Sequence, residues 1–182
     1  MEENYTIGKV IEEAFNSGKN YFLWGKADTG KTLTAFKLAK KYGLTMPYKK
    51  TKAGYWLDYK NQKVVLLDDL TDDKVKYIQS KIIEWGDVYP FVVDNNRRKV
   101  RRNKEDDDRI DYDIEYDEKD VDKRKERITE IDPNNYNFII TSRKSPEQLF
   151  SFKFEEDLNK FKRLYTVINT DKDYLQGLPD KK

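Results

Sequence analysis

The sequence predicts an α/β domain with a central, mostly parallel sheet and helices on both faces. Apolar runs without polar alternation occur at residues 21–24, 64–67 and 138–140, and such runs are typical of strands buried on both faces. Segments with helical spacing of apolar residues separate these runs. A glycine-containing turn joins the first run directly to a helix, which is the arrangement of a βα unit.

The totals indicate one polar domain. At 182 residues the chain can build one well-packed core, so we expect residues 1–182 to form a single domain. The 36 basic and 34 acidic residues nearly cancel, and the net charge therefore says little about partners. No run approaches the roughly 20 apolar residues that span a bilayer, and no signal-peptide core precedes the domain. We therefore expect a soluble, intracellular protein with no membrane partner.

Two missing residue types restrict the chemistry. The chain has no cysteine, so it has no disulfide framework. It has no histidine, which excludes Ser-His-Asp and Cys-His nucleophiles and histidine-based zinc sites. Any reaction must therefore use carboxylates, lysine, arginine, hydroxyls and a metal ion.

A phosphate-binding pattern, G-x-x-x-x-G-K-T, follows the first predicted strand. Its members are Gly25, Lys26, Ala27, Asp28, Thr29, Gly30, Lys31 and Thr32. The two glycines allow a tight turn whose N–H groups point inward, and the next helix presents its positive end to a polyphosphate. We expect Lys31 to contact the β- and γ-phosphates of ATP and Thr32 to bind Mg²⁺. The alternative is a chance Gly-Lys-Thr turn.

Adjacent carboxylates end the second buried run. Asp68 and Asp69 follow Val64–Leu67, and the carboxyl end of a central strand faces the ligand in open α/β sheets. We expect Asp68 to hold Mg²⁺ and Asp69 to orient or deprotonate the attacking water. The alternative is a strand that ends in a solvated turn.

The remaining elements are predicted from the spacing of apolar residues and from the residues that begin and end helices and strands. Helices are expected at 4–17, 33–42, 71–86 and 154–163, with a short one beginning at Ser145. Further strands are expected at 89–93, 136–142 and 164–168. Polar residues end the 136–142 strand, where Thr141 and Ser142 would act as nucleotide sensors.

Residues 95–135 form a highly charged insertion, expected as a hairpin or as a partly disordered segment. A basic block opens it, with Arg97, Arg98, Lys99, Arg101, Arg102 and Lys104, and an acidic block follows. Three interpretations stay open: a tolerated surface insertion, a hairpin that binds nucleic-acid phosphates, or a nuclear-import signal.

The order of motifs resembles the superfamily 3 helicase domain of replication initiator (Rep) proteins from small circular single-stranded DNA viruses and related plasmids. The resemblance runs from about Leu23 to Ile168. It rests on the phosphate loop, on residues 52–59 before the Asp68–Asp69 strand, on Tyr89-Pro90-Phe91, and on Thr141-Ser142 followed by Pro146-Glu147.

The resemblance implies an AAA+-like, three-layer P-loop NTPase fold and an ATP-driven DNA helicase active in rolling-circle-type replication. It implies a homo-oligomeric ring, expected to be hexameric, that moves on single-stranded DNA. Lys31 and Asp69 would be catalytic, and Arg163 would be an arginine finger acting on the neighbouring subunit's nucleotide. The basic block would contact DNA. The protein would be cytoplasmic in a bacterial host, and nuclear if the virus infects a eukaryote.

This chain departs from the family at two points, the residue after Thr141-Ser142 and the charged region after Val93, which is far longer than the family's DNA-contacting hairpin. Arg143 stands where the family has a sensor asparagine, and a guanidinium can donate hydrogen bonds but never accept them. Either Thr141 or Ser142 takes over that role, or hydrolysis is slow. The family's nickase uses histidines, so we expect nicking to belong to a separate or missing domain.

Other classes of protein share some of these motifs. An AAA+-type helicase loader or DNA-binding ATPase switch would have the same loop and strand ends. A small-molecule kinase would use the arginine-rich segment as a lid. A binding module without hydrolysis is the alternative that Arg143 leaves open.

Overall fold

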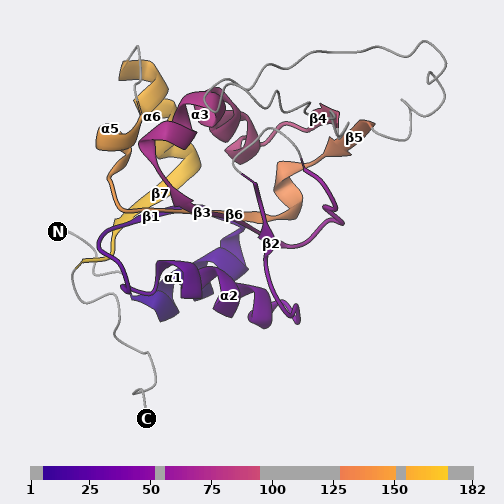
Figure 1. Cartoon of the computed structure of the whole chain (residues 1–182). Helices are drawn as coiled ribbons and strands as arrows, with labels where there is room; N and C mark the ends of the chain where they lie inside the picture. Colours follow the sequence, from indigo (N-terminus) through magenta and orange to yellow (C-terminus); the bar gives the residue numbers. More distant parts are fainter. Residues whose placement is uncertain (1–5, 52–55, 95–127, 151–154, 172–182) are drawn as a thin grey trace, which may run out of the picture.

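A five-stranded parallel sheet organises the fold of the computed structural model (Figure 1). The structure describes residues 6–51, 56–94, 128–150 and 155–171. The strand order is β2-β3-β6-β1-β7, and every pairing within this sheet is parallel. The predicted α/β P-loop NTPase fold is confirmed. Within these described ranges no helix is long and apolar enough to cross a membrane.

The elements alternate along the chain as the sequence predicts. The helices are α1 (Ile7–Ser17), α2 (Lys31–Lys41), α3 (Asp72–Gly86), α5 (Pro146–Leu149) and α6 (Glu155–Leu164), with a 3₁₀ turn η2 (Pro133–Asn135). The strands are β1 (Asn20–Trp24), β2 (Tyr48–Lys49), β3 (Val64–Leu70), β4 (Phe91–Asp94), β5 (Ile128–Ile131), β6 (Asn137–Ser142) and β7 (Tyr165–Asn169). Strand β5 and turn η2 fall inside the predicted insertion and were not expected from the sequence.

Helices cover both faces of the sheet (Figure 1). Helices α1 and α2 lie on one face, and their apolar residues pack with strand residues such as Leu23 and Ile139. Helices α3 and α6 lie on the other face, where Trp85 packs against Phe138 and Phe161 against Phe22. Because side chains alternate along a strand, each buried strand supplies both cores.

An aromatic cluster fills the core on the α3 side. Trp56 is 1 % exposed and lies 5.5–5.9 Å, centroid to centroid, from the rings of Tyr48, Trp85, Phe91 and Tyr136. The Tyr136 hydroxyl donates to the Trp85 carbonyl at 2.7 Å, which ties the start of β6 to the end of α3. Strand β6, which carries this contact, is the central strand of the sheet.

Strands β4 and β5 form a separate antiparallel pair away from the main sheet (Figure 1). The chain passes from β5 through η2 into the amino end of β6, so this pair lies at the amino edge of the sheet. The basic residues of the insertion, Arg97 to Lys104, lie outside the described residues, as do residues 52–55 of the family motif. Their expected contacts stay predictions.

Candidate nucleotide site

The loop Gly25–Thr32 joins β1 to α2 at the carboxyl edge of the sheet. Its backbone enters the left-handed region at Gly25 (φ 142°), Asp28 (φ 62°) and Gly30 (φ 84°). A Cβ on Gly25 would lie 2.6 Å from Asp171 Oδ1, so a side chain there would not fit. The loop is therefore shaped as a curved backbone with the N-terminus of α2 behind it, which favours an anion.

Lys31 is folded back onto this loop. Its Nζ donates to the carbonyl oxygen of Gly25 at 2.9 Å, to the hydroxyl of Thr29 at 3.1 Å, and to the carbonyl of Lys26. Burial lowers the pKa of Lys31; the nearby charge of Arg143 acts in the same direction, while nearby carboxylates, led by Asp171, oppose it. The ammonium group is thus held at the loop, where a phosphate would replace carbonyl oxygens as its partner.

Asp171 places a carboxylate against the phosphate loop. Its Oδ1 accepts a hydrogen bond from the Lys26 backbone N–H at 2.5 Å, and the neighbouring Thr170 hydroxyl lies 2.6 Å from the Thr29 hydroxyl. Neither residue could be predicted for the site, because no local pattern links residues after β7 to a loop 145 positions earlier. An anionic ligand entering this loop meets a carboxylate already beside it.

Asp68 connects the loop to the centre of the sheet. Its Oδ1 accepts hydrogen bonds from the hydroxyls of Thr32 and Thr141, each at 2.7 Å. The hydroxyl oxygen of the loop and the carboxylate of β3 are therefore adjacent, as expected for two ligands of one cation. The three side chains come from α2, β3 and β6.

A bulge at the end of β3 sets the direction of Asp69. Leu67 pairs with Ile140 and Leu70 with Ser142, so β3 has one residue more than β6 over this interval. Asp69 occupies the left-handed region (φ 49°), and its N–H donates to the Thr141 hydroxyl at 2.8 Å. The bulge leaves the Asp69 side chain 54 % exposed beside the partly buried contacts of Asp68.

The two predicted sensors differ in their contacts. Thr141 bridges both acids, because its hydroxyl donates to Asp68 and accepts from the Asp69 N–H. The Ser142 hydroxyl instead donates to the Leu70 carbonyl at 2.9 Å and accepts from the Lys144 N–H at 3.1 Å. Of the two, only Thr141 touches the acidic pair, and the sensor role of either residue stays a prediction.

A magnesium site fits this arrangement in part. Within the described residues, no group of three or more acidic side chains is placed to hold a metal ion. Magnesium in nucleotide sites uses one or two protein ligands and completes its shell with phosphate oxygens and water. Thr32 and Asp68 can supply those protein ligands, so the residues present suit a metal that arrives with a nucleotide.

Arg163 lies away from these groups. It is exposed in the last turn of α6, directly before β7, and Tyr165 pairs with Asn20 at the amino end of β1. Strand β7 has five residues, so its first and last residues are roughly 13 Å apart. Arg163 is therefore at the edge of the sheet opposite the phosphate loop of its own chain.

Fold and site together define a P-loop NTPase of the α/β class. Residues 21–100 match a family model described as RNA helicase, which is the superfamily 3 helicase domain found in viral replication proteins. The match covers 80 of the 182 residues, and it confirms the predicted resemblance to the superfamily 3 helicase domain. A search of the curated proteins finds no match. The matched helicase family supports a helicase-type, NTP-hydrolysing function, and it suggests nucleotide and metal use, nucleic-acid binding and oligomer formation in general.

Proposed function

We propose that this chain is the ATP-dependent DNA helicase domain of a replication initiator protein. In this proposal residues 1–182 form one motor domain that assembles into a homo-oligomeric ring, which we expect to be a hexamer. ATP and Mg²⁺ are its cofactors, single-stranded DNA is its track, and nicking belongs to a separate domain or protein.

The observation that carries the proposal is the hydrogen-bonded series from Thr32 through Asp68 and Thr141 to Asp69. It links Thr32, the loop residue after Lys31, to the two acidic residues of β3, through hydrogen bonds of 2.7–2.8 Å. A phosphate-binding loop alone would serve a binding module or a kinase. An added, exposed carboxylate beside the metal ligands supports hydrolysis by water.

Each residue has a defined task in this proposal. The loop amides and Lys31 bind the phosphates, and Thr32 with Asp68 hold Mg²⁺, which offsets charge on the β- and γ-oxygens when bound. Asp69 accepts a hydrogen bond from the water that attacks the terminal phosphorus. Thr141 holds the two acids in place through its single hydroxyl.

The test measures ATP turnover and strand displacement on the same preparation. We expect single-stranded DNA to stimulate ATP hydrolysis more than single-stranded RNA of the same sequence, and tailed DNA duplexes to be unwound. Lys31→Ala should lower turnover about 100-fold or more, because it removes a charge that stabilises the transition state. It serves as the control for contaminating ATPases.

Each outcome separates one alternative. ATP hydrolysis stimulated by DNA without strand displacement would indicate a helicase loader or switch. Stimulation by RNA alone would indicate that RNA is the nucleic-acid substrate. Hydrolysis indifferent to either nucleic acid would favour a kinase. Absence of nucleotide binding would contradict the proposal entirely.

The basic block of the insertion gives a second prediction. Replacing Arg97, Arg98, Arg101 and Arg102 by Ala should weaken binding to single-stranded DNA. It should also flatten the dependence of log Kd on log salt by about 0.7 for each phosphate that the protein no longer neutralises. A matched variant removes four charges from exposed lysines elsewhere, Lys40, Lys60, Lys63 and Lys76. Equal effects in the two variants would leave the insertion without a specific role.

A further inference from the structure

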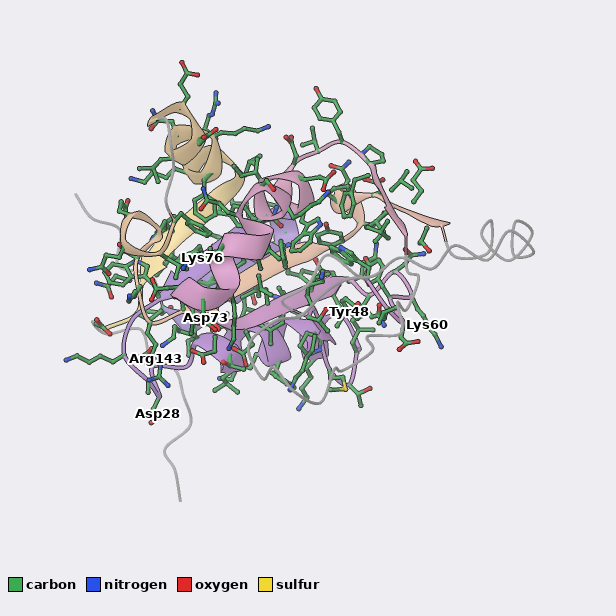
Figure 2. All side chains as sticks on the ribbon, turned by 45° about the horizontal axis from the view of Figure 1, so that its top comes forward. Asp28, Tyr48, Lys60, Asp73, Lys76 and Arg143 are labelled. Atoms are coloured by element: carbon green, nitrogen blue, oxygen red, sulfur yellow. The ribbon has the colours of Figure 1, made fainter. Side chains whose placement is uncertain are left out.

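Arg143 stands at the open end of the candidate site. It directly follows β6, and β6 lies between β1, which leads into the phosphate loop, and β3, which ends in the two acids. Figure 2 shows Arg143 and the loop residue Asp28 at the same end of the molecule. Any group attached to β6 at this point is therefore flanked by the loop on one side and the acids on the other.

The guanidinium of Arg143 is paired with the proposed catalytic carboxylate. Its Nε lies 3.7 Å from Asp69 Oδ1, and the two side chains are 71 % and 54 % exposed. A long ion pair between exposed groups contributes little to stability, because both charges stay hydrated. Arg143 can therefore leave Asp69 at a small cost in free energy when an anion of higher charge binds to the guanidinium.

The charges around this pair belong to one site. Burial is the largest cause that lowers the pKa of Lys31, and Arg143 lowers it further; Asp171, the strongest opposing charge, raises it together with Asp69 and Asp28. Arg143 therefore opposes the charged form of Lys31, and both residues follow strands that end at the carboxyl edge of the sheet. An anion with several negative charges, placed between them, would offset this unfavourable interaction.

The chemistry of a guanidinium selects among anions. It carries five N–H donors in a planar fork, matches two oxygens of a phosphate at once, and cannot accept a hydrogen bond from water. At this position it cannot orient a water molecule as an amide would. It is suited to grip phosphate oxygens.

We propose that Arg143 binds the terminal phosphate of the nucleotide held by its own chain, and that Asp69 is released from the guanidinium as this contact forms. The inference rests on the proposed function, since it requires a nucleotide on the phosphate loop. The nucleotide would then contact two arginines, Arg143 of its own subunit and Arg163 of the neighbouring subunit. It also makes Arg143 the residue that distinguishes a triphosphate from a diphosphate.

The test compares affinities for a non-hydrolysable ATP analogue and for ADP, both with Mg²⁺. In Arg143→Ala the affinity for the triphosphate analogue should fall about 10-fold or more, the effect of one charge-assisted contact. The affinity for ADP should change less than about 2-fold. Arg143→Lys should recover part of the loss, because it returns the charge without the fork.

Lys144→Ala is the matched control. Lys144 is the adjacent basic residue, but its Nζ lies 2.6 Å from Asp72 Oδ2 at the start of α3. It should leave both affinities unchanged. The retained ADP affinity also shows that each variant is folded.

The results separate this inference from the function beneath it. If the wild type prefers the triphosphate and Arg143→Ala keeps that preference, or loses both nucleotides equally, the inference is overturned and the proposed function stands. If the wild type binds neither nucleotide, both are overturned.

Discussion

Asp69 has a backbone conformation that few residues other than glycine adopt. Its φ of 49° lies in the left-handed region, which aspartate tolerates better than most residues and which costs on the order of 1–3 kcal/mol. The hydrogen bond from its N–H to Thr141 offsets part of that cost. Asp69 thus combines backbone strain with an exposed carboxylate next to the hydrogen-bonded Asp68. Backbone strain of this kind is found most often at active sites.

Lys50 is a buried lysine in the aromatic cluster. It is 4 % exposed, and its Nζ lies 4.3 Å from the centroid of the Trp85 ring and donates to the Thr51 carbonyl at 3.0 Å. Burial lowers the pKa of Lys50 to about 7. Between that value and the ordinary lysine pKa, the unfolded chain binds a proton that the folded chain does not.

The free energy of unfolding should therefore rise with pH above about 7, by up to about 1.4 kcal/mol per pH unit from this group. The penalty for the buried charge is fully present below pH 7 and disappears as the pH rises toward the pKa of the unfolded state. Urea midpoints of the wild type and Lys50→Met at pH 7, 8 and 9 measure the difference. Lys49→Met, at the exposed neighbour, is the control.

The stability of Lys50→Met should depend on pH less steeply than that of the wild type, while Lys49→Met should follow the wild type. Parallel pH profiles for the wild type and Lys50→Met would show that the lysine keeps an ordinary pKa in the fold.

Residues within a local pattern could be predicted from the sequence, and residues brought in by tertiary packing could not. Lys31 and Asp68 follow from a motif and from a strand end, and the structure brings Asp68 to within hydrogen-bonding distance of the residue after Lys31. Asp171 reaches the loop only because β7 pairs with β1, and that pairing leaves no mark in the local sequence. The burial of Lys50 depends in the same way on rings far along the chain.

Among the elements, the order of the strands matters most for the site. Strand β6 is inserted between β1 and β3, so its end can contact both the loop and the acids. The apolar runs of β3 and β6 predicted these strands because residues buried on both faces need no polar alternation. Their order could not be predicted, and neither could β5, since its partner β4 lies across the long charged segment.

Helix α6 and strand β7 give Arg163 a place that suits action between subunits. The residue is exposed at the amino edge, opposite the phosphate loop of its own chain. We predict that mixing Arg163→Ala with Lys31→Ala subunits restores activity that neither variant has alone. In an equal mixture about a quarter of the interfaces would combine an intact loop with an intact arginine.

The recovery is measured as ATP turnover after the two variants are mixed and reassembled on DNA. Mixing Lys31→Ala with Thr32→Ala is the control, because both changes damage the same side of each interface and should give no recovery. Arg163 would lose the finger role if its mixture stayed as inactive as this control.

At the scale of the whole molecule, the carboxyl and amino edges of the sheet carry different functional groups. The carboxyl edge holds the phosphate loop, the acids and Arg143, while the amino edge holds Arg163 and the β4–β5 pair that leads into the charged insertion. Subunits that join one edge to the other would form a heterologous interface, which closes into a ring when the rotation allows. The proposed ring requires each chain to carry a nucleotide site at one edge and an arginine for its neighbour's nucleotide at the other.

The most direct test of the central claim is to measure nucleotide affinity and turnover together in Asp69→Asn. The amide keeps the shape of the side chain but is a much weaker proton acceptor than the carboxylate, so we predict ATP affinity within a few-fold of the wild type and turnover reduced about 100-fold or more. Unchanged turnover in Asp69→Asn would contradict the account, since water would then be activated without the carboxylate next to Asp68.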